Sequence, residues 1–214
     1  FFWGSLMFFV LGGFILFFGA AFGIYGPMPD LQELENPKTN LATQIISADG
    51  AILGKYYFDD NRTPIDFDEI PIHMVDALIA TEDERFYEHS GIDWRGTLRA
   101  FIYLGKRGGA STITQQLARQ IFVGIRSRNI FKTILQKAQE WVIAVQLERR
   151  YTKKEILAMY LNKYDFGYQA DGIRSAAKIF FNKTPQQLTI EESATLVGML
   201  KNSSLYNPIR RPER

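Results

Sequence analysis

The chain has no cysteine and, at formal net charge +2, little excess charge of either sign in its 214 residues. Without cysteine, disulfides and thiolate zinc sites are excluded, although the cellular compartment stays open. A charge this close to balance argues against a nucleic-acid-binding protein. Internal repeats and low-complexity tracts are also lacking. The length allows one domain of roughly 150–200 residues with its own core, plus an appendage.

The appendage is residues 1–29, which carry no charged side chain at all before Asp30. At about 1.5 Å per residue, some 25 helical residues cross the ~30 Å hydrocarbon core of a bilayer. Trp3 and Tyr25 suit anchoring at its two interfaces. A cleaved signal peptide, the alternative, has an apolar region of only ~7–15 residues. We therefore predict a transmembrane helix over residues 1–26.

A short β-rich region follows the uncharged segment. Residues 27–42 are polar, contain three prolines and are typical of a linker. The next stretch, TQIISADGAILGKYYF, has two β-rich runs joined at Asp49-Gly50, which is a strong hairpin signal. We predict a linker and β-hairpin neck over residues 27–70.

Residues 71–214 show the apolar spacing of helices and predict a mainly α-helical domain. Two helix starts carry capping-box patterns, Thr152 with Glu155 and Thr189 with Glu192. Helical stretches are expected at 72–80, 94–105, 112–124, 133–150, 152–162, 171–181 and 189–201.

An acidic cluster ends the first of these helices. The stretch ATEDERFYEHSGID, residues 80–93, brings six ionisable side chains together around Glu82. Unpaired carbonyls at a helix C-terminus and the neighbouring acids Asp83 and Glu84 disfavour a charged carboxylate at Glu82. That tuning suits a general base working near neutral pH. A solvated turn is the alternative.

A glycine-rich turn opens another helix, in GGASTITQQLARQ, residues 108–120. Its free amides and helix dipole could bind an anion, and Arg119 would add a full positive charge. The pattern Thr112-x-x-Gln115 could equally be only a capping box. Both readings stay open from the residues alone.

The longest helical stretch, 133–150, carries Lys137 and Glu140 three residues apart along the flank of its apolar face. An ordinary ion pair worth a few tenths of a kcal/mol is one interpretation. The other is that Glu82 and Glu140 face one cleft, which would equip it for acid/base chemistry at a glycosidic centre.

Together these stretches resemble the family 51 glycosyltransferases, the peptidoglycan glycosyltransferase domain of class A penicillin-binding proteins and their monofunctional relatives. The family's first motif, E-D-x-x-F-x-x-H-x-G, is matched by Glu82, Asp83, Phe86, His89 and Gly91. Its second motif, G-x-S-T-I-T-Q-Q, is matched throughout Gly109 to Gln116.

The remaining motifs follow in the family's order and spacing. The third, R-K-x-x-E, is met by Lys137 and Glu140, with Gln136 in place of the arginine. The fourth, K-x-x-I-L-x-x-Y-L-N, is complete and comprises Lys153, Ile156, Leu157, Tyr160, Leu161 and Asn162. The fifth, R-R-x-x-V-L, is not matched, because Arg210-Arg211 precede Pro212. We expect the sequence to stop just short of that motif, C-terminally truncating the glycosyltransferase domain, 71–214.

The resemblance implies a lysozyme-like helical fold and a hexosyltransferase that polymerises lipid II. In that mechanism Glu82 is the base that deprotonates the 4-hydroxyl of the acceptor sugar. The oxygen attacks C1 of the growing strand with inversion, forms a β-1,4 bond and releases polyprenyl diphosphate. Glu140 would assist on the donor side, while Lys137 and Arg119 offset developing negative charge.

The resemblance further implies a set of substrate-binding residues, which comprises Asp83, Phe86, His89, Gly109, Ser111, Thr112, Gln115, Gln116, Arg119, Lys137 and Asn162. No metal ligands are predicted, and a divalent cation (Mg²⁺ or Mn²⁺) at the donor diphosphate is an open alternative. Expected partners are lipid II, the lipid-linked glycan strand, the bilayer and proteins of cell-wall synthesis, but no nucleic acid. The expected location is the bacterial inner membrane, in a single pass, with the catalytic domain on the periplasmic face.

The segment IFVGIRSRNIFK, residues 121–132, is apolar with flanking cations and is interpreted as a flap that dips into headgroups, or else as a buried connector. Two other functions stay open. One is a non-catalytic membrane scaffold of cell-wall assembly, which the Gln136 substitution motivates. The other is a lysozyme-like enzyme that cleaves peptidoglycan.

Overall fold

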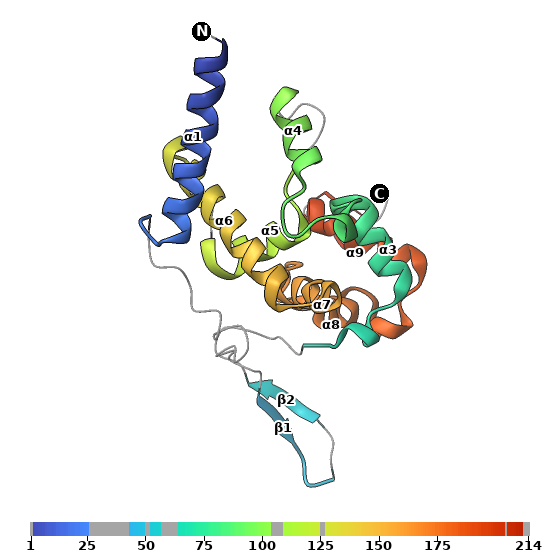
Figure 1. Ribbon diagram of the computed structural model, residues 1–214. Coiled ribbons are helices and arrows are strands. Elements are labelled where there is room, and N and C mark those ends of the chain that lie inside the picture. Colours follow the sequence, from blue (N-terminus) through green and yellow to red (C-terminus); the bar gives the residue numbers. More distant parts are fainter. Residues whose placement is uncertain are drawn as a thin grey trace. The chain divides into compact units, whose positions relative to one another are not determined.

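A computed structural model describes residues 2–25, 43–49, 52–56, 64–103, 109–124, 127–203 and 205–211 (Figure 1). The described chain is mainly helical, as predicted. It divides into two compact units, one comprising Phe1–Glu35 with Tyr87–Thr152 and the other Asn36–Phe86 with Lys153–Arg214. The boundary falls inside the acidic cluster, so Glu82 belongs to the second unit.

The first unit is built on the long helix α6 (Ile130–Arg150), against which α1 (Phe2–Ala21) and α5 (Ile113–Ala118) pack. It also holds α4 (Trp94–Ile102) and the π-helix η3 (Arg119–Val123), which continues α5. Helix α6 begins three residues earlier than predicted. Its start is set by Asn129, whose side-chain oxygen accepts the N–H groups of Phe131 and Lys132 at 2.9 and 3.3 Å.

No helix among the described residues has the length and mean hydropathy that crossing a bilayer requires. The predicted span over residues 1–26 is therefore not found there.

The second unit contains an antiparallel hairpin and a helical core. Strands β1 (Thr43–Ile46) and β2 (Ile52–Tyr56) pair with Thr43 opposite Tyr56, on either side of the predicted turn (Figure 1). The helices are α3 (Ile72–Glu82), α7 (Lys153–Lys163), α8 (Gly172–Phe181) and α9 (Ile190–Lys201), with the short helices η1 (Phe67–Glu69) and η4 (Pro185–Gln187). A further short helix, η2 (Phe86–Glu88), crosses the boundary between the units.

The core of the second unit forms where α3 packs on α9 and where α7 packs on α8. Apolar residues at helical spacing fill it, which explains why the sequence pattern located these helices well. The fully buried side chains include Met74, Leu78, Tyr160, Leu161, Ile173 and Leu196. The predicted capping box at Thr189 and Glu192 is confirmed.

The connection between α7 and α8 has a backbone conformation that is unusual for its residues. Gly167, Tyr168 and Gln169 are three consecutive residues with positive φ, at 79°, 56° and 61°. Left-handed backbone is costly for residues with a Cβ, so this turn must be held by its surroundings. The backbone N–H of Gly167 donates to Asp165 Oδ1 at 2.7 Å, and the guanidinium of Arg210 donates to the Tyr168 hydroxyl at 2.9 Å.

Glu192 is expected to make the thermal stability of the second unit depend on pH. The ammonium of Lys183, 2.7 Å away, and then the backbone N–H of Thr189 lower the pKa of Glu192 below its usual value. A carboxyl whose pKa is depressed in the folded state stabilises the fold above its unfolded pKa, and that stability is lost as pH falls through the folded value. We expect thermal unfolding scans from pH 7 to about 3 to show a smaller acid-induced drop in Tm for Glu192→Gln than for the parent. Equal drops in Tm for the parent and Glu192→Gln would contradict this. Glu84→Gln, at an exposed residue of the same unit, is the matched control.

Candidate active site

Lys137 organises the polar residues of the first unit. Its ammonium donates three hydrogen bonds, to Ser111 Oγ at 2.8 Å, Gln115 Oε1 at 2.9 Å and Glu140 Oε2 at 2.8 Å. Helix α6 supplies Lys137 and Glu140, one turn apart, whereas the other two acceptors come from α5 and the residues just before it. The second and third sequence motifs thus meet at one charged nitrogen.

The carbonyl of Gly91 is a second meeting point. It accepts hydrogen bonds from Thr112 Oγ1 at 2.8 Å and Gln115 Nε2 at 3.1 Å. The Gly91 N–H donates to His89 Nδ1 at 3.2 Å, so that ring nitrogen is the unprotonated one. Gly91 has φ +90°, and an added Cβ would lie 2.9 Å from the backbone of Ala144 on α6. Only glycine fits this close approach.

Thr112 and Gln115 make one of the two hydrogen bonds that define a capping box. Thr112 is the N-cap of α5, and its hydroxyl accepts the Gln115 N–H at 3.1 Å. The Gln115 side chain does not return to the cap, because it joins the Gly91 carbonyl to Lys137 instead. Gln115 is completely buried, so its amide serves this internal link.

Glu140 is the most unusual group of the site. It is only 1% exposed, and although Oε2 is paired with Lys137, Oε1 has no hydrogen-bond partner among the residues that the structure describes. An unpaired buried carboxylate oxygen is unfavourable unless something else satisfies it. The arrangement therefore suits a hydrogen-bond donor or a cation that arrives with a substrate.

Two further contacts of α6 were not expected from the sequence. Thr114 Oγ1 donates to Glu148 Oε1 at 2.6 Å, which ties α5 to α6 at a second place. Gln136 Oε1 accepts the backbone N–H of Ser127 at 2.9 Å. An arginine has no acceptor and could not make that bond, so the substitution at Gln136 has a structural use. Neither contact has a signature in sequence spacing.

In the second unit, Glu82 is the last residue of α3 and is half-buried. Asp83 follows as the C-cap and is buried, with its N–H bonded to the Ile79 carbonyl. Phe86 is completely buried, and the ammonium of Lys153 lies 4.2 Å from its ring centroid. The prediction that Glu82 stands at a helix end is confirmed. Because Glu82 and Glu140 belong to different units, their common cleft stays a prediction.

Gly109, Gln116 and Arg119 are further predicted substrate-binding residues of the first unit. Gly109 is exposed, and an added Cβ there would meet nothing within 4 Å. The backbone N–H of Gln116 bonds to the Thr112 carbonyl, and Arg119 begins the π-helix η3. π-helical turns are frequent at functional sites. Among the described residues, no group of three or more His, Asp or Glu side chains could hold a metal ion.

Asn162 lies in the second unit and its side chain clamps a backbone segment. The amide donates to the Ile65 carbonyl at 2.8 Å, and its oxygen accepts the Ile65 N–H at 3.0 Å. Asn162→Leu should lower the free energy of unfolding by about 1–3 kcal/mol, because both Ile65 groups lose their partner. At temperatures where the variant stays folded, we expect an unchanged KM for lipid II, the substrate that the family resemblance implies. A raised KM with unchanged stability would assign Asn162 to substrate binding instead.

A family model described as "Transglycosylase" matches residues 49–214. The chain belongs to the transglycosylase family. It is 41% identical to penicillin-binding protein 1A of Escherichia coli K12 over 204 residues, which cover 92% of this chain and 23% of that protein. It is 41% identical to penicillin-binding protein 1F of Bacillus subtilis over 177 residues, 81% of this chain and 24% of the relative.

A third relative, penicillin-binding protein 1A of Vibrio cholerae, is 37% identical over 209 residues, which is 96% of this chain and 25% of the relative. This transglycosylase chain thus spans about a quarter of the length of the curated relatives it matches. The matched range includes all four motifs, from Glu82 to Asn162.

Proposed function

We propose that this transglycosylase domain is a peptidoglycan glycosyltransferase that polymerises lipid II into β-1,4-linked strands and has the lysozyme-like helical fold of its family. The observation that carries the proposal is the pair of half-buried Lys137 and buried Glu140, in which residues of the second motif hold the Lys137 ammonium in place. The fixed ammonium suits the negative charge of a leaving diphosphate. The Glu140 oxygen that has no hydrogen-bond partner among the described residues suits a donor group or a cation that arrives with the substrate.

On the acceptor side, Glu82 takes the proton of the sugar 4-hydroxyl. The freed oxygen attacks C1 of the growing strand, the bond from C1 to the diphosphate breaks, and configuration at C1 inverts. The half-buried position of Glu82 at the end of α3 supports this role, because the carboxylate stays accessible to a substrate hydroxyl. Asp83 and Phe86 hold that helix end in place rather than touch the sugar.

On the donor side, Lys137 offsets the negative charge of the departing polyprenyl diphosphate, and Arg119 adds a second cation. Ser111 and Gln115 aim the Lys137 ammonium, while Thr112 and Gln115 fix the loop at Gly91. In this proposal most of the second motif positions other residues. The proposal assigns direct substrate contact to Gln116, His89 and the backbone at Gly109.

A divalent cation at the donor diphosphate remains part of the proposal only as an alternative. It would neutralise phosphate charge, and the unpaired Glu140 Oε1 offers it one ligand. Mg²⁺ in proteins is commonly held by one or two carboxylates together with substrate phosphates and waters, so Glu140 would hold such a cation here.

We also propose that the domain works at the periplasmic face of the bacterial inner membrane, anchored by residues 1–26. The support is compositional: the first 29 residues carry no charged side chain. Both expected substrates are lipid-linked, so an anchored enzyme meets them in the plane of the bilayer. Proteins of cell-wall synthesis are the further partners that this location would offer.

The proposal is tested by supplying reconstituted protein with lipid II and measuring released polyprenyl diphosphate together with sugar incorporated into polymer. Inverting transfer predicts one lipid diphosphate for each disaccharide added. Release without polymer would indicate hydrolysis. Neither product from a folded protein would indicate a scaffold that has lost the reaction.

A further inference from the structure

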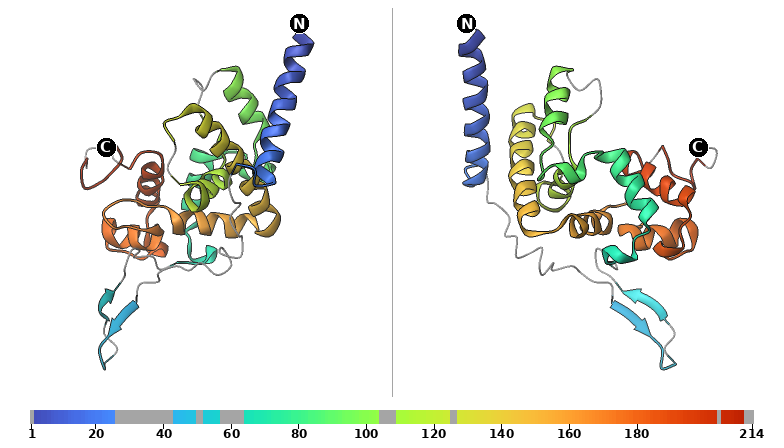
Figure 2. Two further views of the ribbon diagram at one scale, coloured as in Figure 1. Left: turned by 90° about the vertical axis from the view of Figure 1, so that its left-hand side faces the viewer. Right: turned by 45° about the vertical axis from the view of Figure 1, so that its right-hand side comes forward.

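Glu148, near the C-terminal end of α6, makes a contact that the proposed transfer reaction does not use. Its Oε1 accepts a hydrogen bond from Thr114 Oγ1 at 2.6 Å. Thr114 is completely buried, and Glu148 is half-buried. A short bond from a hydroxyl to a carboxylate is among the stronger hydrogen bonds in proteins. It therefore joins α5 firmly to α6, on which α5 also packs (Figure 2).

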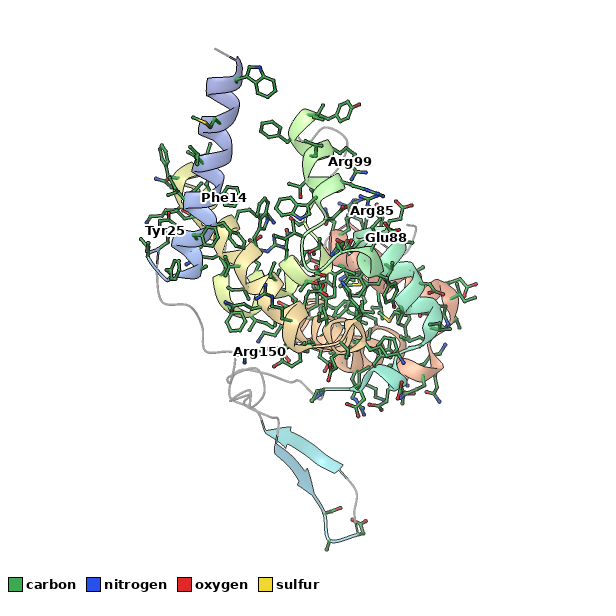
Figure 3. All side chains as sticks on the ribbon, in the orientation of Figure 1. Phe14, Tyr25, Arg85, Glu88, Arg99 and Arg150 are labelled. Atoms are coloured by element: carbon green, nitrogen blue, oxygen red, sulfur yellow. The ribbon has the colours of Figure 1, made fainter. Side chains whose placement is uncertain are left out.

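Helix α6 holds α5 at two separate places. At the first, the Lys137 ammonium donates to Gln115 Oε1 at 2.9 Å. Glu148 lies about three helical turns further along, so both side chains leave the same face of α6, roughly 16 Å apart along its axis. Figure 3 labels Arg150, the last residue of α6, at the end that carries Glu148. Consecutive side chains of a helix point about 100° apart, which lets Thr114 and Gln115 reach the two anchors from a single turn of α5.

The loop at Gly91 supports α5 from a further side. Its carbonyl accepts hydrogen bonds from Thr112 Oγ1 at 2.8 Å and Gln115 Nε2 at 3.1 Å. Gly91 itself lies against the backbone of Ala144, which is between the two anchors along α6. A short helix held in this way cannot turn without breaking at least one of these bonds. The loss of one anchor would therefore let α5 turn and displace the Gln115 amide.

We propose that Glu148 is a positioning residue for Lys137. Through Thr114 it holds α5 in the orientation in which Gln115 meets the Lys137 ammonium. The alternative is that the bond only stabilises the fold. The inference rests on the proposed function for its effect on turnover, because a lipid diphosphate is the leaving group that Lys137 would serve. The position of the ammonium can be measured without that substrate.

Three single variants and one double variant separate the hydrogen bond from the charge. Glu148→Met removes the acceptor of the buried Thr114 hydroxyl. Glu148→Gln removes the charge but keeps an oxygen that can accept the same bond, and it is the matched control. Thr114→Val removes the donor at nearly constant shape. If both residues act through their shared bond, Thr114→Val/Glu148→Met should be no worse than either single variant.

The position of the ammonium is measured by labelling lysines with acetic anhydride in the full reconstituted chain without lipid II, read by mass spectrometry. Lys183 of the second unit is the internal reference, because its ammonium is also paired with a glutamate and its side chain is 34% exposed against 28% for Lys137. We expect Glu148→Met and Thr114→Val to raise the labelling of Lys137 relative to Lys183 about threefold or more, since fewer hydrogen bonds then hold the ammonium. Glu148→Gln should keep the parental ratio. General loosening of the fold would raise the labelling of both lysines.

Lipid II turnover is then compared well below the Tm of each variant. We expect Glu148→Met to lower kcat about tenfold or more with KM nearly unchanged, because a displaced cation stabilises the developing diphosphate charge less. Glu148→Gln should retain the parental kcat. A parental labelling ratio in Glu148→Met would overturn the proposal, and so would a parental kcat in a variant whose Lys137 has become more reactive. A parent without turnover would count against the proposed function, and the labelling ratio would still decide whether Glu148 positions Lys137.

Discussion

Glu82→Gln is expected to lower the rate of lipid II polymerisation by about 10²–10⁴-fold while leaving the fold intact. The substitution keeps the shape of the side chain and removes its ability to take a proton. Because Glu82 ends α3, a neutral amide meets the helix-end carbonyls at least as favourably as a carboxylate does. Thermal unfolding should therefore be unchanged or slightly raised.

Glu84→Gln is the matched control for this prediction. Glu84 lies two residues further along, is exposed and belongs to the same acidic cluster, so its loss changes the net charge by the same amount. We expect it to polymerise at the rate of the parent. Equal turnover by Glu82→Gln and Glu84→Gln would remove Glu82 from the role of base and leave the cluster as a solvated turn.

Lys137→Met is expected to lose both activity and stability. The variant leaves the Glu140 carboxylate, 1% exposed, without its only cation in the network, and it leaves Ser111 and Gln115 without their shared donor. Breaking a fully buried pair costs about 3–5 kcal/mol, and because Lys137 is 28% exposed we expect a loss below that range. Denaturant unfolding in detergent measures the loss, and lipid II turnover measured well below the variant's Tm separates it from unfolding.

The double variant Lys137→Met/Glu140→Gln distinguishes a structural pair from a functional one. Removing both charges should restore much of the lost stability, because no buried charge is then left unpaired. Activity should stay as low as in the single variant, since the donor side still lacks its cation. Activity that returns with stability would show that Lys137 only supports the fold.

The helices could be predicted from sequence because their signals are local. Apolar spacing located α3, α7 and α9, and the cap at Thr189 marked where α9 begins. The acidic cluster was placed correctly at a helix end for the same reason. The start of α6 was missed because Asn129 caps it within a segment whose apolar and basic residues resembled a loop.

The contacts of the candidate site could not be predicted, because they depend on tertiary packing. Gln115 looked like half of a capping box, yet it joins the Gly91 carbonyl to Lys137. Asn162 belongs to a family motif, but its amide is used by the Ile65 backbone. Tyr168 and Gln169 have positive φ angles, which glycine adopts far more readily than other residues. These two residue types therefore gave no indication of the turn in the sequence.

The most direct test is to incubate the reconstituted protein with labelled lipid II and to read glycan length by gel. The account predicts long β-1,4-linked strands that grow with time and depend on Lys137. Preformed glycan that shortens in the same vesicles, with no growth from lipid II, would contradict it.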